Sequence, residues 1–277
     1  MDQAIRGQSD MNRTPPKSVR QVLATEVGFG CPVAKCGSPY LSWHHFDPPW
    51  AESNHHNPEG MIALCRPHHD MADGGVFTKD ELKELKKNPY RNSEGVVGKF
   101  EYLRQTLLAV IGGNFYLEVP HLVTLRRKPI IWFTRDTSGY LLLNLEVPAS
   151  SPDSQLILED NYWMLTTGQP LEFECPPHGR LIHARYSNGD ELRVEFFEIT
   201  SEADLLSKYP KWNQRWSPIL RFPITAVEIL AQVPTEGISF NANSSRTSGV
   251  VMIGNLVSHQ LCGLQLDGPP GQLSVAF

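Results

Sequence analysis

The sequence predicts an α+β protein with a helical, metal-binding N-terminal part over residues 15–113 and a mostly β part over residues 114–277. Two observations support this division. Three of the five cysteines and six of the ten histidines fall between residues 31 and 69, which indicates a metal site. After residue 114 the sequence changes to short β-rich runs separated by turn residues. Residues 1–14 are polar and without pattern, and we expect them to be disordered.

Composition limits the class of protein. A hydrophobic fraction of 40% and a charged fraction of 20% are typical of a soluble globular chain. With no apolar run of membrane-spanning length and no apolar signal core near the N-terminus, we expect a cytoplasmic protein without membrane contact. The net charge of −5 argues against a protein that simply coats nucleic acid. The excess acid lies behind residue 113, so the N-terminal part is neutral.

Three helices are expected in the N-terminal part. Residues 18–26 place apolar side chains at helical spacing. A second, basic helix begins at a capping box formed by Thr78 and Glu81 and ends before Pro89. The apolar spacing over residues 100–110 predicts a third helix, closed by two glycines.

Strands dominate the prediction for the C-terminal part. Asn188-Gly189 lies between two β-rich runs and predicts a hairpin. Gly113-Asn114 and Gly254-Asn255 each open a similar apolar pattern, which is compatible with a small element of stacked strands. The expected strands include residues 129–133, 140–145, 181–186 and 192–197.

Four residues have the spacing of a structural zinc site. Cys31 and Cys36 form one chelating pair with four residues between them, and Cys65 and His68 form a second with two between. Tetrahedral zinc is commonly bound by two such close pairs. The alternative is a chance distribution of cysteines, which the six nearby histidines make the weaker reading.

The remaining histidines extend the pattern. His44-His45 precede an apolar strand over residues 61–64, and His69 directly follows the last zinc ligand. Over residues 31–75 the segment resembles the His-Asn-His (HNH) endonuclease family, whose fold is a ββα-metal finger. The resemblance implies a metal-dependent endonuclease that hydrolyses phosphodiester bonds and leaves 3′-hydroxyl and 5′-phosphate ends.

The resemblance also implies roles for individual residues. His45 would be the general base, while His44 and His69, with Asp73 one helical turn later, would hold a catalytic divalent ion of the Mg²⁺, Mn²⁺ or Ni²⁺ class. The alternative for the paired histidines is packing within the finger. The family's middle Asn is replaced by Gly60, and we expect Asn57 to brace the loop that carries the base.

Several alternatives stay open. Nucleic acid is the expected partner, DNA rather than RNA, and a basic set following the finger would contact phosphate or form an ordinary solvated face: Lys79, Lys83, Lys86 and Lys87. Loss of the Asn at Gly60 leaves open a zinc finger that binds nucleic acid without cutting it. A purely structural zinc site is the third reading. For residues 114–277 we expect a targeting or sensing role toward DNA, a protein partner or a signal ligand.

Overall fold

The computed structural model describes residues 11–91, 95–166, 170–247 and 249–276. It is a mixed α+β protein with more strand than helix, as predicted. The chain divides into two compact units, Met1–Val96 and Val97–Phe277. The expected disordered tail falls mostly on residues 1–10, which lie outside the described part of the chain.

The boundary between the units lies earlier than residue 113 because the helix predicted over residues 100–110 is wrong. Residues 100–107 instead connect β3 (Val96–Lys99) to β4 (Leu108–Ile111), and residues 108–110 belong to β4 itself. β4 is buried at every position, since it pairs with β14 (Ile224–Val233) in parallel and with β5 (Asn114–Leu117) in antiparallel orientation. A strand covered on both faces has no polar alternation, so its sequence can mimic the apolar spacing of a helix.

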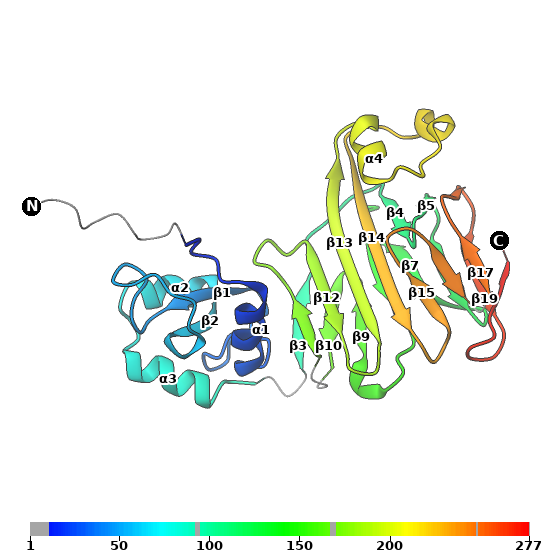
Figure 1. Ribbon diagram of the computed structural model, residues 1–277. Coiled ribbons are helices and arrows are strands. Elements are labelled where there is room, and N and C mark those ends of the chain that lie inside the picture. The colour runs from blue at the N-terminus through cyan, green and yellow to red at the C-terminus, as the bar shows by residue number, and fades with distance from the viewer. Residues whose placement is uncertain (1–10, 92–94, 167–169, 248, 277) are drawn as a thin grey trace, which may run out of the picture. The chain divides into compact units, whose positions relative to one another are not determined.

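The N-terminal unit contains a two-stranded antiparallel sheet with a helix directly after it (Figure 1). β1 (Leu41–His45) pairs with β2 (Met61–Cys65), and α2 (Arg66–Asp73) begins at the next residue. β2 is buried at all five positions and contacts α1 (Lys17–Glu26), which supplies Leu23 to the same core. β1 ends at His45 opposite Met61, whereas α2 begins after Cys65 at the other end of the two strands. The helix therefore contacts β1 along its length and brings Asp73 to His44.

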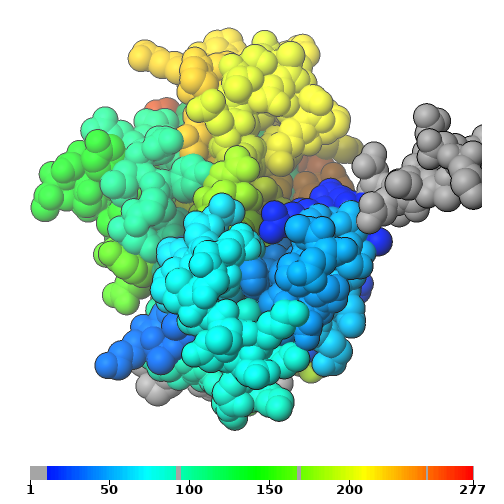
Figure 2. Space-filling view, turned by 90° about the vertical axis from the view of Figure 1, so that its left-hand side faces the viewer, coloured from blue at the N-terminus to red at the C-terminus, as the bar shows by residue number. Residues whose placement is uncertain are grey.

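α3 (Lys79–Lys87) closes this unit and begins at the predicted capping box. The Thr78 hydroxyl accepts from the Glu81 backbone N–H, and the Glu81 carboxylate accepts from the Thr78 backbone N–H at 2.7 Å. The two contacts satisfy backbone donors that the first helical turn leaves free. The helix lies at the surface of the unit, in the cyan region of the space-filling view (Figure 2).

The C-terminal unit is built on two sheets (Figure 1). Among the described residues, one has eight strands: β20 (Ser274–Ala276), β19 (Cys262–Asp267), β6 (His121–Leu125), β7 (Lys128–Arg135), β8 (Leu141–Leu145), β9 (Leu156–Glu159), β10 (Tyr162–Leu165) and β3. The other has ten: β4, β5, β11 (Glu172–Glu174), β12 (Leu181–Arg185), β13 (Glu191–Ile199), β14, β15 (Ile238–Phe240), β16 (Ser245–Thr247), β17 (Val250–Met252) and β18 (Leu256–Ser258). The four β-rich runs expected from sequence lie in β7, β8, β12 and β13, and the Asn188-Gly189 turn joins the last two.

Two segments with similar sequence are stacked in parallel in this unit. β18 pairs with β5, and β19 pairs with β6. The Asn114 side-chain oxygen accepts from the backbone N–H of Asn255 at 3.1 Å and from its side-chain amide at 2.9 Å. The echo between Gly113-Asn114 and Gly254-Asn255 therefore corresponds to two parallel strands paired side by side in one sheet, with the two asparagines bonded to each other where the strands begin.

The core of the C-terminal unit is apolar and includes a short helix, α4 (Glu202–Lys208). Leu205 from this helix packs with Phe115 and Trp212, whose rings meet edge to face at 4.8 Å. Within the part of the chain that the structure describes, no helix has the length and apolarity needed to cross a membrane.

Candidate metal sites of the N-terminal unit

The first candidate site gathers the four predicted zinc ligands. The Sγ atoms of Cys36 and Cys65 lie 3.7 Å apart, and His68 Nδ1 lies 3.1 Å from Cys65 Sγ and 3.4 Å from Cys31 Sγ. Metal–ligand bonds of 2.0–2.3 Å in a tetrahedron would separate ligand atoms by about 3.3–3.8 Å. Cys31, Cys36, Cys65 and His68 therefore lie close enough together to hold one metal ion.

Local backbone structure explains this convergence. Between Cys31 and Cys36 the chain makes a tight turn in which Lys35 and Gly37 have positive φ, and the Cys31 carbonyl accepts from the Gly37 N–H. The other pair spans the junction between β2 and α2, where Cys65 ends the strand and His68 lies in the first helical turn. Burial raises the pKa of the Cys31 thiol to about 12. A bound cation would offset that cost by stabilising the thiolate.

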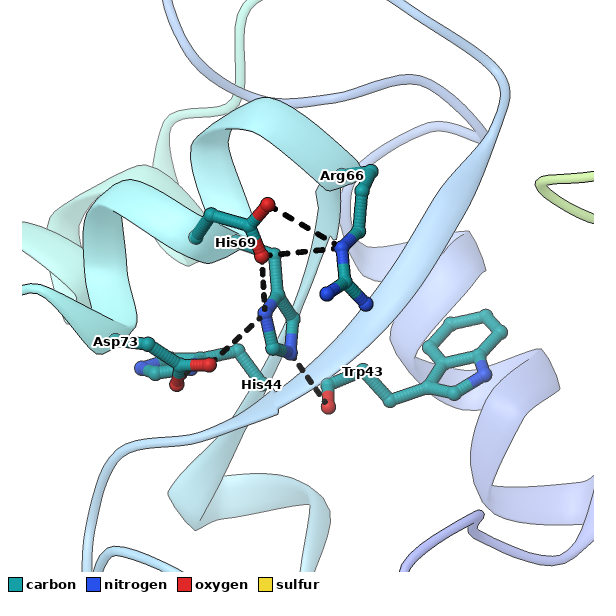
Figure 3. A network of polar contacts seen from close by, with 6 residues as sticks. Trp43, His44, Arg66, His69 and Asp73 are labelled. Atoms are coloured by element: carbon teal, nitrogen blue, oxygen red, sulfur yellow. Dashed lines mark hydrogen bonds and ion pairs between the residues drawn. The ribbon is translucent and has the colours of Figure 1, made fainter.

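The second candidate site brings together His44, His69 and Asp73 (Figure 3). His44 Nδ1 lies 3.1 Å from one Asp73 carboxylate oxygen, and His69 Nδ1 lies 3.4 Å from the other. The two imidazole rings are 5.2 Å apart and nearly perpendicular. β1 supplies the first histidine, while α2 supplies His69 and Asp73 from the same helical face, as their four-residue spacing predicts.

The donor chemistry of this trio fits a divalent ion. His44 and His69 are 6% and 7% exposed, and the buried Nδ1 atom of each faces the Asp73 carboxylate. Burial, together with His69, lowers the pKa of His44, which favours the neutral form that binds metal. Asp70 instead pairs with Arg66, and its nearer carboxylate oxygen lies 4.0 Å from His69 Nδ1. The carboxylate of this site is therefore Asp73 and not Asp70.

His45 lies beside this trio in the wall of a cavity of about 350 Å³, which His44 and Asp73 also line. It is 3% exposed, and neither ring nitrogen has a hydrogen-bond partner among the described residues. Burial and the neighbouring His55 lower the pKa of His45 to about 4. The imidazole is therefore neutral, with a free nitrogen lone pair, at the edge of a pocket that also contains Trp50.

Asn57, which we expected to brace the loop that carries His45, lies immediately before a short helix. Its side chain caps the short 3-10 helix Pro58–Gly60 by accepting from the Glu59 N–H at 3.2 Å. His55 also makes contacts within this loop: its Nε2–H donates to the Pro48 carbonyl at 2.8 Å, while its Nδ1 accepts from the Asn57 N–H. The sequence contains only a weak signal for this contact, because His55 and His56 are adjacent and no local pattern distinguishes them.

The four lysines after the finger differ in their surroundings. Lys79 and Lys83 each lie 3.0 Å from the Asp47 carboxylate, and these contacts lower the pKa of that carboxyl. Lys86 is 12% exposed and bonds Glu26 and two backbone carbonyls, so its ammonium group is occupied by contacts within the unit. Only Lys87 is an exposed lysine with none of these contacts, and Lys79 also lines the cavity.

Comparison of the chain with family models, with curated protein sequences and with solved structures gave no match.

Proposed function

We propose that the N-terminal unit is a metal-dependent endonuclease of the HNH type, acting on DNA, with a structural zinc ion and a separate catalytic divalent ion. One observation supports this most directly. His44, His69 and Asp73 offer three ligand atoms within 4.8 Å of one another, and His45 lines the same cavity as His44 and Asp73. Zinc fits the Cys31, Cys36, Cys65 and His68 cluster, since three thiolates and an imidazole in a closed tetrahedron form a structural site.

The residues of the chain divide the chemical work. An ion of the Mg²⁺, Mn²⁺ or Ni²⁺ class held by His44, His69 and Asp73 would supply positive charge near the scissile phosphate and the leaving oxygen. His45, whose imidazole lies in the pocket wall, would take the proton of the attacking water. Asp47, in the loop that follows His45, forms ion pairs with Lys79 and Lys83 of α3.

A second candidate function has an observation of its own. His45 is only 3% exposed, so a phosphate would need the pocket wall to admit it before the base could act. A finger that binds nucleic acid without cutting it would tolerate this burial. That alternative predicts a salt-sensitive gel shift with intact DNA.

The deciding experiment incubates supercoiled plasmid with the full chain in Mg²⁺ or Mn²⁺. We expect nicked or linear product, and we expect His45→Ala to lower the rate by about 10²–10⁴-fold because general-base catalysis is lost. Zinc content should stay that of the wild type, since His45 is outside the cysteine cluster.

A matched pair of carboxylate variants tests the ion site. Asp73→Asn should abolish cleavage, whereas Asp80→Asn, which changes an exposed carboxylate in the first turn of α3, should not. Equal activity of the wild type and His45→Ala would refute the proposed base. A gel shift without cleavage in every divalent ion would favour the binding module.

A further inference from the structure

A third group of metal-ligating side chains lies in the C-terminal unit, on the outer strands of the ten-stranded sheet. β11 and β12 are antiparallel, with Glu174 opposite His183 and Glu172 opposite Arg185. Residues two apart in a strand share a face, so both glutamates and the histidine lie on one face. Glu172, Glu174 and His183 each offer a ligand atom, and all three atoms lie within 4.8 Å of one another.

The orientation of His183 is set by a residue from the third strand. His183 Nε2 lies 2.7 Å from the carboxylate of Glu191 on β13, while Nδ1 points toward Glu172 Oε1 at 3.8 Å. If Glu191 accepts the Nε2–H, the neutral ring presents its Nδ1 lone pair to the glutamates. A carboxylate bonded to the far nitrogen is the usual outer partner of a metal-binding histidine.

Charge around the cluster favours a divalent cation. Among the described residues, three carboxylates (Glu172, Glu174 and Glu191) lie around His183, and the Arg185 guanidinium reaches Glu172 Oε2 at 3.2 Å. The carboxylates outnumber this guanidinium, so these side chains carry a net negative charge. Arg193 does not change the balance, because it is paired with Glu195 at 2.7 Å. Glu172 is 11% and His183 13% exposed at the side chain, so water screens this charge poorly.

We propose that Glu172, Glu174 and His183 bind a divalent transition-metal ion of the Zn²⁺ class, with Glu191 orienting the histidine. A nitrogen ligand beside two carboxylates suits Zn²⁺ better than Mg²⁺ or Ca²⁺, which prefer oxygen ligands throughout. Three protein ligands leave a fourth position for water or a ligand, as in zinc sites that are not purely structural. The C-terminal unit would thus bind a metal ion of its own, and this proposal does not depend on the proposed nuclease activity.

The test counts Zn²⁺ ions per full-length chain by native mass spectrometry after equilibrium dialysis against Zn²⁺. We expect the wild type to hold one ion more than His183→Gln and one more than Glu174→Gln. Glu198→Gln, which changes an exposed carboxylate farther along β13, is the matched control and should keep the wild-type count. All four proteins carry the same N-terminal unit, so the difference does not depend on how many ions that unit holds.

A second measurement separates an ion site from a network of salt bridges. Glu191→Gln should keep the ion but weaken its affinity by about 10–100-fold, because the outer partner of the histidine is lost. Competition with a zinc indicator measures this. Equal counts in the wild type, His183→Gln and Glu174→Gln would overturn the proposal and leave His183 as an imidazolium bridging two glutamates. Glu174 is half-buried, so Glu174→Gln keeps the test usable if the histidine variant does not fold.

Discussion

Gly60 lies directly against the backbone of Asp47, the second residue after His45. The Gly60 carbonyl accepts from the backbone N–H of Phe46 at 2.9 Å and from that of Asp47 at 3.2 Å. A β-carbon on Gly60 would overlap the Asp47 carbonyl oxygen. Gly60, at the position where the HNH family has an Asn, thus contacts the loop after His45 through its backbone carbonyl. The short distance between Gly60 and Asp47 leaves no room for a side chain, so this position requires glycine.

Gly60→Ala should therefore destabilise the N-terminal unit by about 1–3 kcal/mol, because two backbone segments would have to separate. Chemical denaturation measures the free energy of unfolding. Gly74→Ala is the control, since a β-carbon there would meet nothing closer than 3.5 Å, and its effect should stay within about 0.5 kcal/mol. Equal stability of the two variants would contradict the packing seen at Gly60.

His55 should act as a positioning residue for the loop that carries His45. His55→Ala removes the hydrogen bond to the Pro48 carbonyl, worth about 1 kcal/mol, and should lower the cleavage rate about fivefold. His55→Gln keeps a donor and should recover part of the rate. Zinc content should stay that of the wild type, and the loss of stability should not exceed about 1 kcal/mol. A parallel fall in rate and zinc content would mean that His55 supports folding alone.

Lys86 and Lys87 should separate structure from nucleic-acid contact. Lys86→Ala leaves the carbonyl oxygens of Pro58 and Met61 without their 2.6 and 2.7 Å bonds, and should cost about 2 kcal/mol of stability. Lys87→Ala should leave stability within about 0.5 kcal/mol. If Lys87 contacts phosphate, its loss should reduce the slope of log affinity against log salt by about 1. A stable Lys86→Ala variant would contradict the buried role.

Removal of metal should unfold one unit and leave the other. The N-terminal unit has a small core joined at Cys31, Cys36, Cys65 and His68, so chelation should abolish its thermal transition. The C-terminal unit, with its own sheets and core, should keep a separate transition. Circular dichroism with and without a strong chelator tests this, and Cys65→Ser should reproduce the effect of chelation. A single transition unchanged by chelator would contradict a structural ion.

Alkaline pH should destabilise the C-terminal unit through Tyr209. The Tyr209 hydroxyl donates a hydrogen bond to the Glu228 carboxylate at 2.8 Å. Burial and this carboxylate raise the pKa of Tyr209 above its ordinary value of 10.0. A raised folded-state pKa gives stability that is complete below pH 10 and falls above it, since only the unfolded chain then releases the proton.

Denaturation midpoints at neutral pH and above pH 10 measure this loss. Tyr209→Phe should cost about 2 kcal/mol at neutral pH, because it leaves Glu228 without its donor. The variant should also lose less stability than the wild type on moving to alkaline pH. Tyr162→Phe, at a side chain that is 59% exposed, is the control. An identical pH profile in all three proteins would show that Tyr209 does not carry the dependence.

Local patterns in the sequence predicted most of what the N-terminal unit contains. The capping box at Thr78 and the spacing of Cys65 and His68 are properties of a few consecutive residues, and so is the placement of His69 and Asp73 on one helical face. Such features depend on backbone geometry that short segments carry with them. The cluster of three cysteines and one histidine was also predictable, because two chelating pairs at these spacings are typical of one zinc site.

Long-range pairing decided the rest. The apolar spacing at residues 100–110 was compatible with a helix, whereas Leu108–Ile111 is a strand that pairs with β5 across the Gly112-Gly113 turn and with β14, more than a hundred residues away. Packing also brought together Asn114 and Asn255, His55 and the Pro48 carbonyl, and Glu172 and His183. Sequence alone fixes which groups are present and their local geometry; which of them meet depends on packing between segments that no local pattern encodes.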